Sequence, residues 1–158
     1  MQNFLNNIKL KSINRSILED KENIIEEIKF EDSPLNREKY PLLFSLKYIL
    51  DFYFGEISLN TIVSFSAKSN KGFTQELAID VIKEVGLFGV ARDMKALDIP
   101  NHFLPCIIFD EKDSPYILRK KSKECYLYDP ITNSEIKKDI SYLKNFKTAI
   151  LVFRDSKK

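Results

Sequence analysis

The spacing of the hydrophobic residues predicts one very apolar helix in the first half of the chain. Residues 41–54, PLLFSLKYILDFYF, are apolar on nearly every helical face. Pro41 suits the first position of a helix, and Gly55 suits its end. Because so apolar a helix is normally surrounded by the rest of its domain, we expect residues 41–54 to form the central helix of the fold.

Two further helices are predicted before residue 87. Ser58 can cap the first, in ISLNTIVSFSA, and Thr74 can cap the second, in KGFTQELAIDVIKEVG. Gly86 follows the second helix at a position that suits a left-handed helix end. This second helix has the clearest periodicity in the chain, with one face made of Leu77, Ala78, Val81, Ile82 and Val85.

The period changes after Gly86, where short runs rich in β-branched and aromatic residues are typical of strands. Residues 138–146, KDISYLKNF, favour one or two helical turns before the last run. Helices followed by strands with short connections predict an α+β domain, with N-terminal helices packed on a C-terminal, mostly antiparallel sheet. The predicted strands are LFGVAR (87–92), LPCIIFD (104–110), PYILRK (115–120), CYLYD (125–129) and TAILVFR (148–154).

The first 36 residues are polar and mixed in charge, and we expect them to form a partly helical leader outside the core. Residues 23–30, NIIEEIKF, are weakly amphipathic, and Ser33-Pro34-Leu35-Asn36 is expected to break that helix. Residues 37–154 then make up the domain, and residues 155–158 are a tail or the start of a linker.

Composition is consistent with a single soluble domain, and charge is distributed unevenly along the chain. The chain has 158 residues, 44% of them hydrophobic, which is enough for one buried core. The net charge is only +2, but residues 111–158 carry 12 basic and 7 acidic side chains, a net charge of +5. No stretch approaches the ~20 apolar residues of a membrane helix, and the N-terminus has no secretion signal, so we expect a cytosolic protein.

The residue types that most catalytic and metal sites require are scarce. His102 is the only histidine, which excludes a site with two histidine ligands, and its place before a predicted strand favours a surface or loop position. Cys106 and Cys125 lie in strand-like runs without CxxC spacing, so both are expected to be packed thiols. Phosphate-binding loops and the hydrolase motif GxSxG are absent. We expect neither a metal nor a cofactor.

The densest group of charges is Arg119-Lys120-Lys121-Ser122-Lys123. Its position between two predicted strands favours a solvated hairpin turn, although clustered cations can also attract an acidic partner. The neighbouring residues Tyr116, Tyr126 and Tyr128 could stack on nucleic-acid bases, but alternation within strands favours packing in the sheet.

Taken in order, PLLFSLKYILDFYFGEIS, GFTQELAIDVIKEVGLFGVAR, LPCIIFD, PYILRK and CYLYDP resemble the C39 peptidases and their inactive relatives over residues 37–154. The resemblance implies a papain-like (cysteine proteinase) fold, with the nucleophile at the start of the central helix and the other triad members on the sheet. It also implies the N-terminal domain of a bacterial ABC exporter, so that residues 155–158 would begin a linker to the membrane domain. The parent transporter would be an ATPase, although this chain contains no ATPase motif.

The resemblance also assigns the positions of the family's catalytic groups. The nucleophilic cysteine falls on Ser45, the oxyanion-stabilising glutamine on Lys39 and the general-base histidine on Pro115, while Asp129 matches the orienting acid. A serine hydroxyl is a poor nucleophile without a base, and Pro115 has no side-chain proton acceptor. With no imidazole for Asp129 to orient, we expect no peptidase activity.

The resemblance therefore implies a binding domain, which holds an unfolded secretion substrate, an adhesin or a toxin, for type I export. It would work at the cytoplasmic side of the bacterial inner membrane beside the membrane and ATPase domains of the same exporter, with no nucleic acid as partner. Two alternatives stay open: an active or residual bacteriocin-type leader peptidase, with Ser45 and Asp129 as its participants, and a small basic nucleic-acid-binding module. The candidate contacts with the substrate are Tyr116, Tyr126, Tyr128, Arg119, Lys120 and Lys121.

Overall fold

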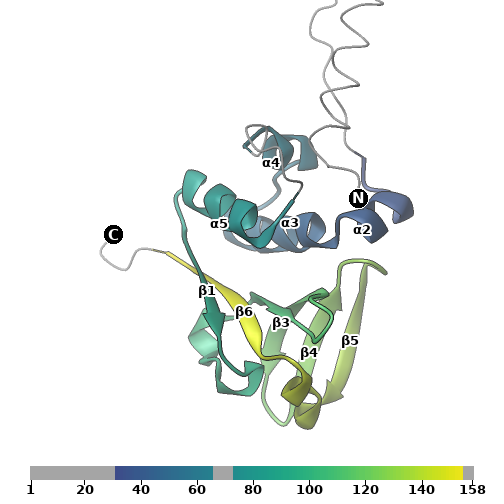
Figure 1. Ribbon diagram of the computed structural model, residues 1–158, viewed down its shortest axis with the longest axis vertical. Coiled ribbons are helices and arrows are strands. Elements are labelled where there is room, and N and C mark those ends of the chain that lie inside the picture. Colours follow the sequence, from purple (N-terminus) through teal and green to yellow (C-terminus); the bar gives the residue numbers. More distant parts are fainter. Residues whose placement is uncertain (1–30, 66–72, 155–158) are drawn as a thin grey trace, which may run out of the picture.

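The computed structural model describes residues 31–65 and 73–154, in which a layer of helices lies against one face of an antiparallel sheet (Figure 1). The helices are α2 (Pro34–Lys39), α3 (Pro41–Phe54), α4 (Leu59–Phe65) and α5 (Gln75–Glu84). The strands are β1 (Phe88–Asp93), β2 (Cys106–Phe109), β3 (Pro115–Lys121), β4 (Glu124–Asp129), β5 (Ser134–Asp139) and β6 (Thr148–Phe153). Three 3₁₀ helices complete this part of the chain: η2 (Ala96–Asp98), η3 (Asn101–Phe103) and η4 (Ile140–Asn145).

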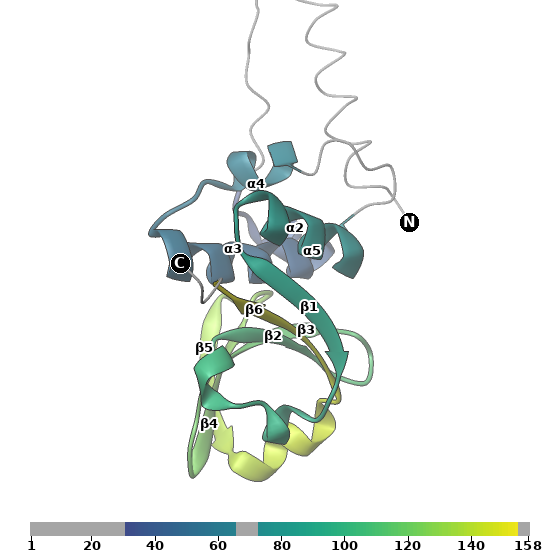
Figure 2. The ribbon, with the colours of Figure 1, turned by 90° about the vertical axis from the view of Figure 1, so that its left-hand side faces the viewer.

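The six strands follow the order β1-β6-β2-β3-β4-β5, and each neighbouring pair is antiparallel. The last strand in sequence, β6, therefore lies inside the sheet, while β1 and β5 form its two edges. Figure 2 shows that the sheet curves away from the helices and that the connecting segments close over its other face. This arrangement confirms the predicted order of helices followed by an antiparallel sheet.

Two hydrophobic cores result, one on each face of the sheet. The first lies between the helices and the sheet and includes Leu43 and Ile49 of α3 with Ile117 of β3. The second lies under the sheet, where Leu127 of β4 packs with Phe146 after η4. Alternate side chains of one strand thus enter different cores, as a pleated strand requires.

Helix α3 is the predicted central helix, although its last turn is not surrounded. Leu43, Leu46 and Ile49 are fully buried, whereas Phe52 is 58% exposed. Near this end, contact with the sheet includes the Tyr53 hydroxyl, which donates a hydrogen bond to the Val152 carbonyl at 2.9 Å. The expectation of an entirely enclosed helix was wrong here, because the sheet covers only one side of the last turn.

The predicted helix ends are confirmed. The Thr74 hydroxyl accepts a hydrogen bond from the Leu77 amide at 3.1 Å, and the Ser58 hydroxyl accepts one from the Thr61 amide at the same distance. Gly86 has φ +92°, in the left-handed region that glycine adopts without strain. None of the helices in the described ranges has the length and the apolar composition to cross a bilayer.

Two elements were not predicted. The first is α2: Ser33 has extended backbone, its hydroxyl accepts a hydrogen bond from the Asn36 amide, and the helix begins at Pro34, because serine caps a helix and proline fits its first turn. Strand β5, SEIKKD, was not predicted, because it is a polar edge strand with only Ile136 turned toward a core. The predicted helix over residues 23–30 lies outside the described residues.

Candidate functional site

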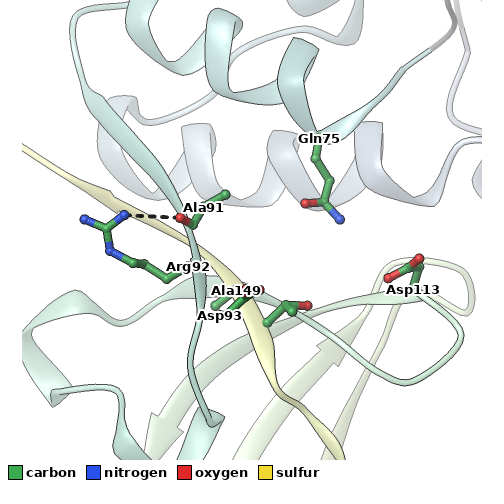
Figure 3. Close-up of a pocket in the computed structure, with 7 residues that line it drawn as sticks. Gln75, Ala91, Arg92, Asp93, Asp113 and Ala149 are labelled. Atoms are coloured by element: carbon green, nitrogen blue, oxygen red, sulfur yellow. Dashed lines mark hydrogen bonds between the residues drawn. The ribbon is translucent and has the colours of Figure 1, made fainter.

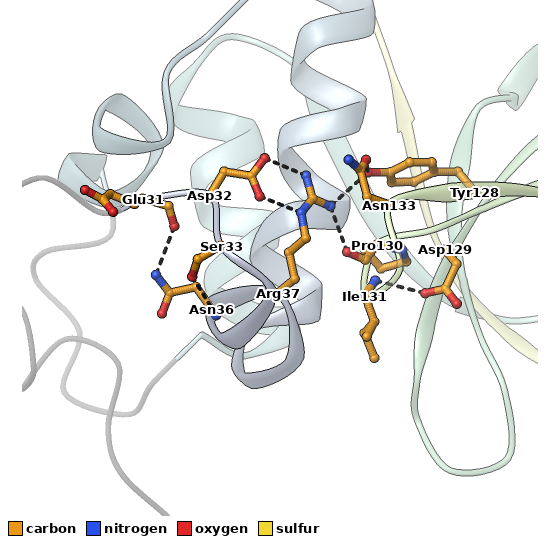
Figure 4. A network of polar contacts seen from close by, with 10 residues as sticks. All are labelled: Glu31, Asp32, Ser33, Asn36, Arg37, Tyr128, Asp129, Pro130, Ile131 and Asn133. Atoms are coloured by element: carbon orange, nitrogen blue, oxygen red, sulfur yellow. Dashed lines mark hydrogen bonds and ion pairs between the residues drawn. The ribbon is translucent and has the colours of Figure 1, made fainter.

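The start of the central helix meets the end of strand β4 through a set of contacts centred on Arg37 (Figure 4). Arg37 lies on α2, four residues before α3 begins. Its Nη1 atom donates hydrogen bonds to the Tyr128 hydroxyl at 2.9 Å and to the Pro130 carbonyl at 2.8 Å. These bonds connect the helical layer to the strand that carries Asp129. We call Asp32, Arg37, Phe44, Tyr128 and Pro130 the Arg37 junction.

The guanidinium of Arg37 is almost completely occupied by partners. Its Nε and Nη2 atoms donate to the two carboxylate oxygens of Asp32 at 2.6 and 2.8 Å, and its carbon lies 4.6 Å from the centre of the Phe44 ring. The hydrogen bond from Arg37 lowers the pKa of Asp32, and the same bond raises the pKa of Arg37. The side chain of Arg37 is only 11% exposed, so this cation has a structural role in joining the two layers.

Tyr128 makes two further contacts beyond its hydrogen bond from Arg37. Its ring stacks on Tyr48 of α3 with ring centroids 4.6 Å apart, and its hydroxyl donates to Asn133 Oδ1 at 2.6 Å. The middle of α3 is therefore held against β4 by ring stacking, while the hydrogen bonds to the end of β4 come from Arg37 of α2.

Ser45, the position assigned to the family nucleophile, is buried inside this layer. Its side chain has no exposed surface, and its hydroxyl donates a hydrogen bond to the Pro41 carbonyl at 2.9 Å, one helical turn earlier. A serine that bonds its own helix in this way is satisfied locally. Lys39, assigned to the oxyanion position, is exposed at the end of α2.

Pro115 and Asp129 lie at the same end of neighbouring strands but belong to opposite faces of the sheet. Ile117, two residues after Pro115, is in the core against the helices, whereas Leu127, two residues before Asp129, is in the other core. Asp129 Oδ1 accepts a hydrogen bond from the Ile131 amide at 2.9 Å and so shapes the turn after β4. Within the described ranges, no hydrogen bond joins Ser45 to Asp129.

The histidine and the two cysteines also lie in different parts of the fold, the histidine on the surface and the cysteines in the core. His102 is exposed on η3, as predicted, and its ring lies 4.4 Å from that of Phe103. Cys106 is fully buried, and burial raises its pKa to about 12; burial also raises the pKa of Cys125. Both are packed thiols, as predicted, and neither is a thiolate near neutral pH. In residues 31–65 and 73–154, no three His, Cys, Asp or Glu side chains gather as metal ligands would.

The six candidate substrate contacts do not form one surface. Tyr116 packs in the core under the sheet, with its ring centroid 5.6 Å from that of Phe146, whereas Tyr128 belongs to the core on the helical side. Burial raises the pKa of Tyr116, and the negative charge of Asp129 on the same face raises it further. Both tyrosines thus pack in the sheet, as the alternation of side chains along each strand favours.

The residues of the basic run, 119–123, also contact different parts of the fold. Strand β3 continues to Lys121, so Ser122 and Lys123 alone separate it from β4, and the expectation that the whole run forms a turn was wrong. Arg119 Nη1 lies 2.7 Å from a carboxylate oxygen of Glu135. Lys121 donates hydrogen bonds to the carbonyls of Leu97 and Ile99, which hold η2 against the sheet. Lys120 Nζ lies 5.7 Å from the centre of the Tyr126 ring.

A pocket of about 320 Å³ opens between the start of α5 and the sheet (Figure 3). Gln75 of α5, Asp93 of β1 and Asp113 of the β2–β3 turn contribute to its lining. Arg92 points away from the pocket in Figure 3 and donates a hydrogen bond to the Ala91 carbonyl. The lining contains neither a cysteine nor a histidine, so this pocket offers no peptidase-type nucleophile and base.

Sequence reasoning missed Arg37 and Tyr48, which contact Tyr128 from the helical layer. Arg37 lies in a polar stretch assigned to the boundary of the domain, and Tyr48 is one of many apolar residues in α3. No local signal distinguishes either residue, because their shared partner lies 80 or more residues away.

Comparisons with known proteins agree on one family. The sequence profile of the Peptidase C39 family matches residues 35–158. No curated protein matches the sequence.

Among solved structures, the N-terminal peptidase C39 like domain of the toxin secretion ATP-binding protein from Vibrio parahaemolyticus is 20% identical. Its TM-score is 0.62, and the match covers 73% of this chain and 97% of that one. A double glycine motif protease from an AMS/PCAT transporter, in complex with the leader peptide, is 16% identical with a TM-score of 0.56; the match covers 84% of this chain and 91% of that one. The peptidase domain of Streptococcus ComA, described as a bi-functional ABC transporter involved in a quorum sensing pathway, is 16% identical with a TM-score of 0.54; the match covers 70% of this chain and 88% of that one. The predicted fold is therefore confirmed.

Proposed function

This chain belongs to the peptidase C39 family, and on that premise we propose that it is a member that binds polypeptides without cleaving them. It would be the C39-like domain of an ABC exporter at the cytoplasmic side of a bacterial inner membrane. Its ligand would be an unfolded secretion substrate, an adhesin or a toxin, held there for ATP-driven type I export. The membrane and ATPase domains of the same exporter would be its other partners.

The observation that carries this proposal is the state of Ser45. A peptidase of this kind needs a nucleophile that is open to the substrate and next to a base. The Ser45 hydroxyl is buried and donates a hydrogen bond to the Pro41 carbonyl. The assigned base position is Pro115, which has no side-chain acceptor. The only histidine, His102, is exposed on η3.

The Arg37 junction is separate support for a domain that does not cleave its ligand. In an active member, the start of the central helix and the strand bearing the acid would face the scissile bond together. Here Arg37 bonds the residue directly after Asp129, and Phe44 and Tyr128 pack around it. Such a network stabilises a closed contact between the two layers. We therefore expect the polypeptide substrate to bind at another part of the surface.

Two solved relatives make a binding role reasonable for this fold. One is described as a C39 like domain of a toxin secretion protein, and another was solved in complex with a leader peptide. A scaffold that holds an extended chain can keep that ability after it loses the chemistry, because main-chain contacts and side-chain pockets are independent of the catalytic groups.

The test combines a cleavage assay with a binding assay. The 158-residue chain is incubated with double-glycine leader peptides and the products are analysed by mass spectrometry; we expect no cleavage. In parallel, NMR titration with an unfolded secretion substrate should shift a defined set of amide signals, whereas the same substrate in its folded form should shift none. Cleavage that disappears in Ser45→Ala would overturn the proposal, as would the absence of any binding to the unfolded chain.

A further inference from the structure

We infer that the edge strand β5, with the lysines around it, is the docking site for an acidic, extended segment of the polypeptide that this domain binds. The inference rests on the proposed binding function and names the chemistry of its ligand. The ligand would add a strand beside β5 through main-chain hydrogen bonds, and its carboxylates would meet lysines on both faces of the new strand.

The first observation is that β5 is an exposed edge. It pairs with β4 over six residues, from Glu124 opposite Asp139 to Asp129 opposite Ser134, and no strand in the described part of the chain pairs with its other side. Five of its six residues are exposed. In an antiparallel edge strand, alternate residues present their amide and carbonyl groups outward, where an extended chain can bond them.

The second observation is the distribution of charge across the sheet. Residues 119–147, which include the end of β3 and all of β4 and β5, carry eight basic and four acidic side chains, a net charge of +4. Residues 73–118, which include the opposite edge strand β1, carry four basic and eight acidic side chains, a net charge of −4. An acidic chain is therefore attracted to the β5 edge and repelled from the β1 edge.

The third observation is how the lysines are placed along the edge. Lys120 and Lys137 lie on either side of β4 in register with Tyr126, with their Nζ atoms 5.7 and 6.0 Å from the centre of its ring. On the opposite face, Lys138 Nζ lies 5.3 Å from the centre of the Tyr142 ring. Since successive residues of an added strand point to opposite faces, neighbouring carboxylates would meet Lys137 and Lys138 in turn.

The net charge of +4 already includes the two acidic residues of β5. Glu135 pairs with Arg119 at 2.7 Å. Asp139 stays ionised, because hydrogen bonds from the amide and the hydroxyl of Ser141 lower its pKa, and it lies at the last position of β5. Among the residues that the structure describes, Lys137 forms an ion pair with Glu124 alone, at 3.3 Å, and both of those side chains are about half exposed.

Lysines on an edge strand ordinarily discourage sheets from joining edge to edge. Here they repel a second copy that presents the same β5 edge, while they attract a chain of opposite charge. The same side chains thus select against self-association and for an acidic ligand.

The test is an NMR titration of the ¹⁵N-labelled 158-residue chain with a short disordered peptide that alternates Asp or Glu with Thr or Val. We expect the shifted signals to centre on β5 and Tyr126, and we expect alternate β5 amides to gain protection from hydrogen exchange. Replacing the acids of the peptide by Asn and Gln should weaken binding at least about tenfold at low salt. A peptide N-methylated at alternate residues, which cannot pair with a strand on one edge, should lose binding equally.

Matched variants of the protein locate the site. The double variant Lys137→Glu/Lys138→Glu should weaken binding about tenfold. Lys137→Gln/Lys138→Gln removes the two charges without reversing them, in case the reversal disturbs the fold, and should weaken binding about threefold. The control Lys95→Glu/Lys112→Glu makes the same change in charge at two exposed lysines away from β5 and should bind within about twofold of the parent.

Each other result has a definite meaning. If the acidic peptide binds but the β5 variants bind it equally well, or the N-methylated peptide binds as tightly, this inference is wrong while the proposed function stands. If an oligonucleotide of equal charge displaces the peptide with a steeper dependence on salt, the lysines form a general polyanion site and the inference is also wrong. If neither the peptide nor any unfolded secretion substrate binds, the proposed function itself fails.

Discussion

Arg37 donates a hydrogen bond to the Tyr128 hydroxyl at 2.9 Å, across 91 residues of sequence. This bond, with the one from Arg37 to the Pro130 carbonyl, connects α2 to the end of β4. Helix α2 leads directly into α3, so these bonds fix how the helix that would carry the nucleophile in an active relative approaches the strand that would carry the acid.

Replacing Arg37 by Ala should destabilise the fold by roughly 2 kcal/mol, because two half-buried acceptors lose a charged donor and the Phe44 ring loses its cation. Urea unfolding followed by circular dichroism measures the change. Glu38→Ala, on an exposed neighbour in α2, is the matched control and should stay within about 0.5 kcal/mol of the parent. An Arg37→Ala protein as stable as this control would show that the junction contributes nothing to folding.

The same junction predicts a dependence of stability on pH. The pKa of Asp32 is lowered in the folded protein by its hydrogen bond from Arg37. Its contribution is therefore complete above the unfolded pKa of about 4, and it is lost as the pH falls through the lower folded pKa. Because the Asp32 side chain is 51% exposed, we expect a loss below about 1 kcal/mol.

The measurement compares unfolding free energies at pH 6 and pH 3 for the parent and for Asp32→Asn. The parent should lose more stability than the variant over this range. Equal losses would mean that Asp32 titrates in the folded chain as it does in the unfolded one.

Restoring catalytic residue types at the assigned positions should not restore cleavage. In Ser45→Cys/Pro115→His, the thiol would occupy a buried position on α3, where burial favours the neutral form of a thiol over the thiolate. We expect no product from double-glycine leader peptides by mass spectrometry, with an active C39 peptidase as the positive control. Specific cleavage after the double glycine would mean that Ser45 reaches the substrate after all.

The two cysteines should be inert in the native protein. Cys106 has a pKa raised to about 12 and no exposed surface, and burial also raises the pKa of Cys125. At neutral pH, a thiol reagent should therefore label neither residue until denaturant is added. Rapid labelling of the native chain, with unchanged circular dichroism, would contradict this burial.

Elements whose signals lie within a few neighbouring residues could be predicted from the sequence. Helix α5 is the clearest example: Thr74 caps it, and Gly86 follows it with a positive φ. The apolar runs of β2 and β6 were also recognised, because strands buried on both faces are apolar throughout. Strand β5 could not be found in this way, because a polar edge strand is held mainly by backbone hydrogen bonds to its neighbour.

The amino-acid sequence by itself determined helices α3, α4 and α5, most strands, the order of the layers and the family pattern, since caps and hydrophobic periods act over a few residues. It also determined that proline stands at the position assigned to the general base. Only the tertiary structure decided which face of the sheet each tyrosine occupies, that the Ser45 hydroxyl is satisfied inside its own helix, and that Arg37 meets Tyr128. Those outcomes depend on the packing of segments far apart in the chain, and no local pattern of residues encodes that packing.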